Sequence, residues 1–249
     1  MVHLDVRIDG LPAALDGFCL AHVSDLHVRE NDWEAKHIAE TASVIRRERP
    51  SLLLNSGDFL QGNPPFLQVV PRVTAILLPQ EETPFRPANI AMLGNHDFDA
   101  GLLEARALAG QLRELGVSVP LNDVVSVSGP AGTIIVAGLT LALPRFREAA
   151  DELRTSGPPR IALIHEPEVA EQIPSGSADL ILAGHTHGAQ ISIPGLRRWA
   201  VKRYAKSGYV AGMYRINDMP LYVNRGLGTT GPPIRFGSAP EVTIIRLVR

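Results

Sequence analysis

The sequence predicts an α/β fold in which stacked sheets are flanked by helices, within a single domain that spans residues 1–249. Short apolar runs bounded by glycine or proline recur throughout the chain, and helical patterns separate the early ones. The chain has 249 residues, of which 45% are hydrophobic and 20% charged, so it can bury a sizeable core and resembles ordinary globular proteins in composition. No linker-like segment, internal repeat or low-complexity tract divides it.

Eight apolar runs predict the strands, because their shortness and their glycine or proline flanks favour strands over helices. Several are too continuously apolar to have a solvent-exposed face, which is typical of strands buried on both sides. In chain order they cover residues 18–23, 52–55, 90–93, 134–141, 161–165, 180–183, 221–223 and 242–247.

Two long helices are predicted between the early strands. Residues 33–49 form the first, which ends before Pro50, and residues 101–115 form the second, with Gly116 as its C-terminal stop. Shorter helices are predicted at residues 66–78, 146–154 and 167–173.

Charge and cysteine content exclude several classes of protein. The net charge of −2 shows no general attraction to nucleic acid, so we expect no specific nucleic-acid partner. The single cysteine, Cys19, excludes an internal disulfide framework. The N-terminus does not look like a secretion signal, and the longest apolar run, residues 133–143, is about half of the roughly 20 residues that a membrane span needs. The sequence therefore predicts a cytoplasmic protein.

Polar side chains that bind metals follow five of the predicted strands, at the point where each strand ends. They are Asp25 and His27 in SDLH, Asp58 in SGD, Asn95, His96 and Asp97 in GNHD, His165, and His185 and His187 in GHTHG. Because ligands of open α/β sheets gather at the carboxyl ends of strands, these side chains are expected to converge on one crevice.

The donor types indicate a metal site. Carboxylates, imidazoles and an amide oxygen without thiolate suit Mn²⁺, Fe or Zn²⁺. In an extended segment residues i and i+2 point to the same side, so Asp25 with His27, and His185 with His187, can each present both side chains to one place. The donors suffice for two ions with a carboxylate such as Asp58 between them, and such a pair polarises a phosphoryl group and generates hydroxide near neutral pH.

Each motif by itself has an ordinary structural interpretation. SDLH can be a helix cap with a surface histidine, SGD a turn, GNHD a loop, and His165 a hydrogen-bonded core histidine. Five such motifs, each directly after an apolar strand, would require five coincidences, so the metal site is the better explanation.

This ordered set of motifs resembles the calcineurin-like metallophosphoesterases over most of the chain, from Asp25 to His187. The resemblance implies a four-layer α/β/β/α sandwich of two mixed sheets flanked by helices, with two divalent metal ions at the strand ends. Mn²⁺ is the expected metal, with Fe or Zn²⁺ as alternatives. The roles carried over are Asp25, His27 and His187 for the first metal, Asp58 as the bridge, Asn95, His165 and His185 for the second, and His96 as leaving-group acid or transition-state stabiliser, oriented by Asp97.

The flanking segments are similar to the bacterial branch that contains YkuE- and YaeI-like phosphodiesterases and enzymes that cleave the pyrophosphate of UDP-2,3-diacylglucosamine. Many members carry an N-terminal membrane or export segment, which we do not expect here. The resemblance implies hydrolysis of phosphodiester or pyrophosphate bonds by a metal-bound hydroxide, on a lipid-linked or nucleotide substrate. The alternatives are a broad cyclic-nucleotide or nucleic-acid phosphodiesterase and a catalytically silent scaffold, which is disfavoured because every expected position is filled.

Residues 194–215 are basic and aromatic and contain no acid. They are interpreted as a cap that contacts anionic lipid at the inner membrane face, as a clamp for a nucleotide, or as a solvated basic surface whose aromatic side chains pack onto a sheet edge. Arg235 is interpreted as a phosphate ligand or as a structural residue of its loop, and the same alternatives hold for Arg225. The candidate substrate-binding residues are Arg197, Arg198, Trp199, Lys202, Arg203 and Arg225.

Overall fold

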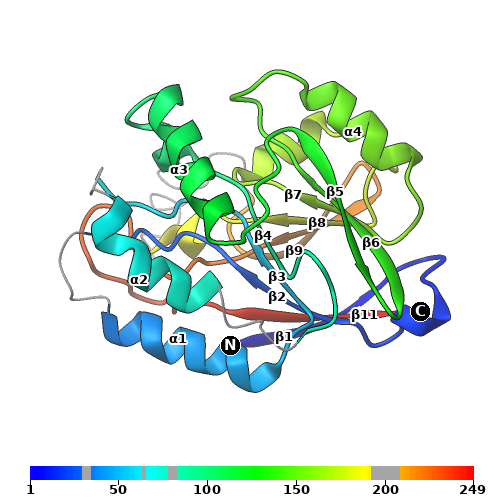
Figure 1. Cartoon of the computed structure of the whole chain (residues 1–249), viewed down its shortest axis with the longest axis horizontal. Coiled ribbons are helices and arrows are strands. Elements are labelled where there is room, and N and C mark those ends of the chain that lie inside the picture. The colour runs from blue at the N-terminus through cyan, green and yellow to red at the C-terminus, as the bar shows by residue number, and fades with distance from the viewer. Residues whose placement is uncertain (30–34, 63–65, 78–82, 192–207) are drawn as a thin grey trace.

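The computed structural model describes residues 1–29, 35–62, 66–77, 83–191 and 208–249. These residues form two mixed sheets with helices on their outer faces (Figure 1). The α/β class and the four-layer arrangement predicted for the chain are confirmed.

The first sheet has five strands in the order β1-β11-β2-β3-β4. Strand β11 pairs with β1 in parallel and with β2 in antiparallel, and β2, β3 and β4 are parallel to one another. Its strands are β1 (Val2–Arg7), β2 (Cys19–Val23), β3 (Leu52–Asn55), β4 (Asn89–Ala91) and β11 (Thr243–Val248).

The second sheet has six strands in the order β5-β6-β7-β8-β10-β9. The four central strands are parallel, and both edge strands run antiparallel to their neighbours. Its strands are β5 (Asp123–Gly129), β6 (Gly132–Gly138), β7 (Arg160–Leu163), β8 (Leu180–Ala183), β9 (Gly212–Ile216) and β10 (Met219–Val223).

Helices cover the outer face of each sheet. In one core cluster Ile45, Ile76 and Leu108, from the three helices of the first sheet, pack with residues of its strands. Leu153 of α4 (Phe146–Thr155) packs with the second sheet, as does the 3₁₀ helix Pro167–Gln172. The helices on the first sheet are α1 (Ala35–Glu48), α2 (Phe66–Leu77) and α3 (Leu102–Glu114).

Strand alternation explains how both faces of the central strands become buried. In β8, Leu180 and Leu182 pack between the two sheets, whereas Ile181 packs under the helices. Leu54 of β3 joins the cluster between the sheets, and Leu53 faces the helices. A strand that is covered on both faces exposes no side chain to water, so its sequence is continuously apolar.

The structure confirms the eight predicted strands and adds β1, β5 and β9 in the described residues. The predicted bounds hold for β3 and β8, and the ends of the other six are shifted. The added strands are mostly exposed or partly buried, with one buried residue each, so they lack the apolar runs that identified the central strands. The predicted helix at residues 167–173 is a 3₁₀ helix. The predicted start of the first helix, at residue 33, lies outside the described residues. No helix in the described part of the chain is long and apolar enough to cross a membrane.

Candidate metal centre

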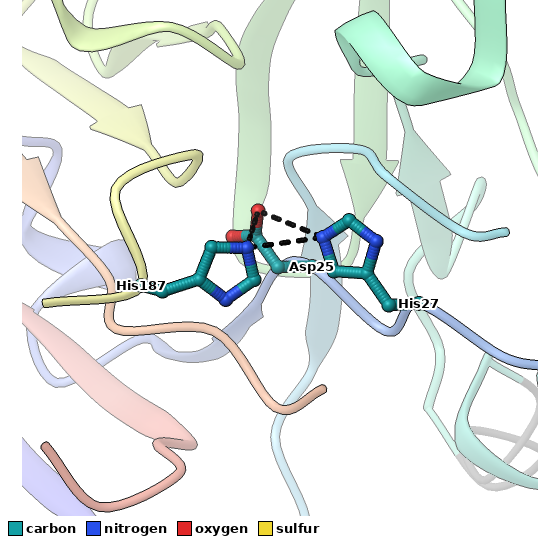
Figure 2. A group of neighbouring side chains, drawn as sticks. All are labelled: Asp25, His27 and His187. Atoms are coloured by element: carbon teal, nitrogen blue, oxygen red, sulfur yellow. Dashed lines mark hydrogen bonds and ion pairs between the residues drawn. The ribbon is translucent and has the colours of Figure 1, made fainter. Parts of the chain in front are cut away.

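The ends of β2 and β3 in the first sheet and of β7 and β8 in the second bring the predicted donors together. Two groups result, and within each the donor atoms all lie within 4.8 Å of one another. Figure 2 shows the first group. The first group is Asp25, His27 and His187, and the second is Asp58, His165 and His185.

In the first group three donor atoms face one point. Nε2 of His27 lies 3.0 Å from Nε2 of His187, and Oδ1 of Asp25 lies 3.8 Å and 3.5 Å from these two nitrogens (Figure 2). Bonds of about 2.1 Å to a tetrahedral ion would separate its ligands by about 3.4 Å. The donor spacing and the donor chemistry therefore fit a divalent ion.

The second group is joined by Asn95. Its Oδ1 lies 3.1 Å from Nε2 of His165 and 2.8 Å from Nδ1 of His185, and Oδ2 of Asp58 lies 3.2 Å from the same His165 nitrogen. On the other side of the His165 ring, Nδ1 donates to the carbonyl oxygen of Ser56 at 2.8 Å. Because a carbonyl can only accept, Nδ1 keeps its proton, and Nε2 is the nitrogen that would bind an ion after losing its own proton.

Asp58 faces both groups. Its Oδ2 lies 3.5 Å from Nε2 of His27 in the first group and 3.2 Å from Nε2 of His165 in the second. Its Oδ1 accepts the backbone N–H of His96 at 2.9 Å. The carboxylate thus lies between the two donor groups.

The backbone at these residues is left-handed. The φ angles are 52° at Asp25, 44° at His27, 57° at Asp58, 71° at His185 and 51° at His187. The extended conformation predicted for the two D-x-H and H-x-H pairs is therefore wrong. Non-glycine residues pay about 1–2 kcal/mol for this conformation, and such strain is concentrated at functional sites. The left-handed turns direct His185 and His187 into different groups.

Glycines allow the strand ends to approach each other closely. A Cβ on Gly184 would lie 1.8 Å from Oγ of Ser24 and 2.5 Å from Oδ2 of Asp25. A Cβ on Gly94 would lie 2.2 Å from Oδ1 of Asp58. Each glycine therefore lets a neighbouring loop contact a carboxylate of the site.

The electrostatics of the centre favour a cation. Burial raises the pKa of Asp58, but the adjacent His165 outweighs this effect and lowers that pKa to about 2. Burial lowers the pKa of His165, but Asp58 outweighs it and holds that pKa well above its ordinary value. At His187 burial dominates and lowers the pKa to about 3. The buried carboxylates of Asp25 and Asp58, whose pKa values are both lowered, therefore remain ionised and require positive charge nearby.

The hydrogen bonds of Asp97 in the described structure go to backbone N–H groups and not to the ring of His96, so the prediction that it orients this ring is corrected. Its carboxylate is buried and accepts backbone N–H groups of Asp58 at 3.0 Å, Phe59 at 2.9 Å and Gly94 at 2.9 Å. Asp97 therefore ties the loop after β3 to the loop after β4.

The acid on the His96 ring is Asp99, whose Oδ2 lies 2.6 Å from Nδ1 of His96. The 3₁₀ helix Asn95–Phe98 turns the Asp97 side chain inward and brings the residue at i+3 back to the histidine. Sequence reasoning missed Asp99, although an acid three residues after a histidine in a turn is a usable signal.

Most of the predicted substrate-binding residues cannot be placed: Arg197, Arg198, Trp199, Lys202 and Arg203 lie outside the described residues. The end of the same segment belongs to the sheet edge, because Gly212 begins β9. Tyr209 donates to Oε1 of Glu171 at 3.1 Å, and its ring packs against that of Tyr214 at a centroid distance of 5.2 Å.

The two arginines of the C-terminal loop have structural partners. Arg225 donates to Oε2 of the buried Glu241 at 2.6 Å, and its side chain is 40% exposed. Arg235 donates to the backbone carbonyls of Gly228 at 2.9 Å and His187 at 3.3 Å. For Arg235 these contacts support the structural interpretation.

Comparison with known proteins agrees with this architecture. Residues 20–189 match the family model for calcineurin-like phosphoesterases. The metallophosphoesterase YkuE of Bacillus subtilis is 30% identical over 95% of this chain and 81% of its own length, and the phosphodiesterase YaeI of Escherichia coli is 26% identical over 85% and 75%. A 5′-nucleotidase-like structure from Staphylococcus aureus superposes with a TM-score of 0.52 at 16% identity, covering 93% of this chain and 54% of that one. That last likeness concerns the fold alone.

Proposed function

The chain belongs to the calcineurin-like phosphoesterase family and is thus a hydrolase of phosphoester bonds, and from this premise we propose that it is a dinuclear enzyme that cleaves phosphodiester or pyrophosphate bonds. The observation that carries the proposal is the pair of buried donor groups with Asp58 facing both. One group alone would be consistent with a single structural ion. A shared carboxylate between two groups is typical of a two-ion centre.

In this proposal the donor residues are divided between two ions. Asp58 is the bridge, and the ions are Mn²⁺, or Fe or Zn²⁺, since nitrogen and oxygen donors without thiolate suit these metals. When bound, the ions supply Lewis acidity toward phosphoryl oxygens and activate a water as the nucleophile. Asp25, His27 and His187 hold one ion, and Asn95, His165 and His185 hold the other.

His96 is proposed as the acid that protonates the leaving oxygen. Its ring lies against that of His27 at a centroid distance of 5.3 Å, and 28% of its side chain is exposed, whereas His27 and His165 are buried. An imidazole at the rim of the centre can reach a bound substrate without being a ligand. A positioned acid of this kind typically accelerates a reaction by about 10²–10⁴-fold.

The proposed substrate is a lipid-linked or nucleotide phosphodiester or pyrophosphate. The name of YaeI as a phosphodiesterase supports the diester class. Arg225 is a candidate phosphate contact, because its side chain is partly exposed and its Cγ would lie 3.0 Å from a Cβ on Gly188 of the histidine loop. Residues 192–207 carry the basic residues Arg197, Arg198, Lys202, Arg203 and Lys206, which we propose for anionic substrate or lipid contact.

Metal analysis and one histidine variant test the proposal. After loading with Mn²⁺ we expect about two ions per chain, and we expect His96→Ala to lower kcat by about 10²-fold or more while keeping both ions. His3→Ala is the matched control, because His3 pairs with Glu48 on the surface and should leave turnover unchanged. A stoichiometry well below two ions would contradict the dinuclear centre. Undiminished turnover of His96→Ala would remove this residue from the mechanism.

The substrate class is tested by a panel with Mn²⁺. The panel contains bis(p-nitrophenyl) phosphate, UDP-2,3-diacylglucosamine, cyclic nucleotides and a phosphomonoester. We expect turnover of diesters or pyrophosphates to exceed that of the monoester. Activity restricted to synthetic diesters and cyclic nucleotides would favour a broad phosphodiesterase over a lipid pyrophosphatase.

A further inference from the structure

We infer that Arg225, held in place by the buried Glu241, binds a second phosphate group of the substrate, next to the phosphate under attack. The inference rests on the proposed function and deepens it, because it selects pyrophosphate substrates over diesters with a single phosphate. Arg225 is the binding residue, and Glu241 is the residue that positions it.

Arg225 lies at the outer edge of the first donor group. Its Cγ and Cδ would lie 3.0 Å and 3.2 Å from a Cβ on Gly188, the residue after His187. The backbone of Gly226 contacts the same group, since a Cβ there would lie 3.0 Å from Oδ2 of Asp25. The Arg225 side chain is nevertheless 40% exposed. It therefore lies beside the centre without being enclosed in it, where a group attached to the reacting phosphate can reach it.

The Arg225 guanidinium engages one of its three nitrogens within the described residues. Nη1 donates to Oε2 of Glu241 at 2.6 Å, and this is the only hydrogen bond of the side chain in the described part of the chain. The edge formed by Nε and Nη2 remains open, and this edge matches two oxygens of a phosphate. Arg225 therefore has the donors that bidentate phosphate binding requires.

Arg235 of the same loop shows the opposite arrangement. Its guanidinium donates to the backbone carbonyls of Gly226 at 3.2 Å, Gly228 at 2.9 Å and Ser238 at 3.3 Å. These contacts hold the loop, so a bound anion would have to displace them. Of these two arginines, Arg225 is the one that can bind an anion without loss of backbone contacts.

Glu241 is a fixed acceptor in the core. Its side chain is 2% exposed, and Oε1 accepts from the hydroxyls of Tyr222 at 2.6 Å and Thr243 at 2.7 Å and from Nδ2 of Asn224 at 3.4 Å. Tyr222 lies in β10 and Thr243 begins β11, so both hydroxyls come from the sheets. The remaining oxygen, Oε2, faces Arg225. The ion pair therefore fixes one end of the guanidinium and holds the open edge in one place.

Three variants separate binding from positioning. Arg225→Gln removes the cation, whereas Arg225→Lys keeps a cation for Glu241 but loses the planar fork. In Glu241→Gln the amide oxygen should take the side on which three donors meet Oε1, which turns the amide NH₂ toward Arg225. Two donors then oppose each other, and the arginine is released. If Glu241→Gln does not fold, Glu241→Asp replaces it, because it keeps the charge and draws the carboxylate back by one methylene.

The experiment is calorimetric titration of Mn²⁺-loaded protein with AMP and with α,β-methylene-ADP. The two ligands share a nucleoside and a first phosphate, and only the second ligand carries another phosphate. We expect the wild-type protein to bind α,β-methylene-ADP about tenfold or more tightly than AMP, because hydrogen bonds between charged groups contribute at least this much.

This preference should depend on both members of the pair. The ratio of the two Kd values should fall by about tenfold in Arg225→Gln and in Glu241→Gln, and Arg225→Lys should show most of the same loss because an ammonium makes no bidentate contact. In the Arg225→Gln background, Glu241→Gln should cause no further loss.

Asp179→Asn is the matched control. Asp179 is another acid of low exposure, 15%, that pairs with an arginine, Arg160, at 2.8 Å. The pair lies at the start of β7 and β8, whereas the metal donors follow the ends of these strands. Neutralising Asp179 should therefore leave both Kd values unchanged.

The outcomes separate this inference from the proposed function. A wild-type ratio near one, or an unchanged ratio in Arg225→Gln or Arg225→Lys, overturns the second phosphate site. A ratio that falls in Arg225→Gln but not in the Glu241 variant, or a Glu241 effect that adds fully to that of Arg225→Gln, overturns the positioning role of Glu241. The dinuclear proposal is decided by the ion count and by turnover of the substrate panel, and the ratio of Kd values enters neither measurement.

Discussion

Asp97 and Asp99 are separated by one residue, yet their environments assign them different tasks. Asp97 is 5% exposed and accepts several backbone N–H groups, so it holds two loops together. Asp99 is largely exposed and contacts one imidazole. A buried acceptor is costly to remove because its donors cannot turn to water, whereas an exposed one is replaced by solvent.

Asp97→Ala is therefore expected to lower the free energy of unfolding by about 3 kcal/mol, because several buried N–H groups lose their acceptor. Asp99→Ala should change it by no more than about 0.5 kcal/mol. Urea unfolding followed by circular dichroism measures both values. Equal losses in the two variants would show that the backbone hydrogen bonds of Asp97 contribute little.

At the scale of elements, the donor side chains come from the residues that follow the strands and not from the strands themselves. The strands supply a buried, rigid support, and the donors lie in the first residues after them. Adjacent loops contact one another at glycines, as Gly184 does with Ser24 and Asp25. The contact holds the loop after β2 and the loop after β8 at a fixed separation.

Gly184→Ala is expected to weaken Mn²⁺ binding by about tenfold or more, since its Cβ would overlap Oγ of Ser24 and displace the Asp25 carboxylate. Gly110→Ala is the control: a Cβ there meets nothing within 4 Å, and alanine favours helix α3 by up to about 1 kcal/mol. Calorimetric titration with Mn²⁺ measures both affinities. Unchanged affinity in Gly184→Ala would mean that the loops adjust without cost.

At the scale of the whole molecule, both donor groups join the two sheets. Asp25 and His27 follow β2 of the first sheet, and His187 follows β8 of the second. The other group likewise combines Asp58 from the first sheet with His165 from the second. A bound ion would therefore connect the sheets at their common edge, and the folded state alone presents the complete set of donors.

Metal should accordingly stabilise the fold. At a free Mn²⁺ concentration one hundred times Kd, each site contributes about 2.7 kcal/mol, which corresponds to about 5–10 °C in Tm for a chain of this size. Scanning calorimetry across a range of buffered Mn²⁺ concentrations measures the shift, with EDTA as the zero point. His187→Ala should lose roughly half of it, whereas a Tm independent of Mn²⁺ would contradict metal binding to the native state.

The predictability of the fold depended on burial. The central strands, such as β3 and β8, were predicted because both of their faces are buried and their sequences are continuously apolar. Strands β1, β5 and β9 were missed because exposed and polar positions interrupt their apolar residues, as in VHLDVR. Helix α3 was predicted within one residue at each end, since Gly101 and Gly116 flank it. The predicted end of α2, at residue 78, lies outside the described residues.

The sequence by itself determined which chemical groups follow which strands, because the donor types and the apolar runs before them are local properties of the chain. Only the tertiary structure decided which partner each of these side chains contacts. It turned Asp97 onto backbone N–H groups of two loops, brought Asp58 between the two donor groups, and paired Arg225 with Glu241. These choices depend on left-handed turns and on contacts between loops far apart in sequence, and no local pattern encodes either of them.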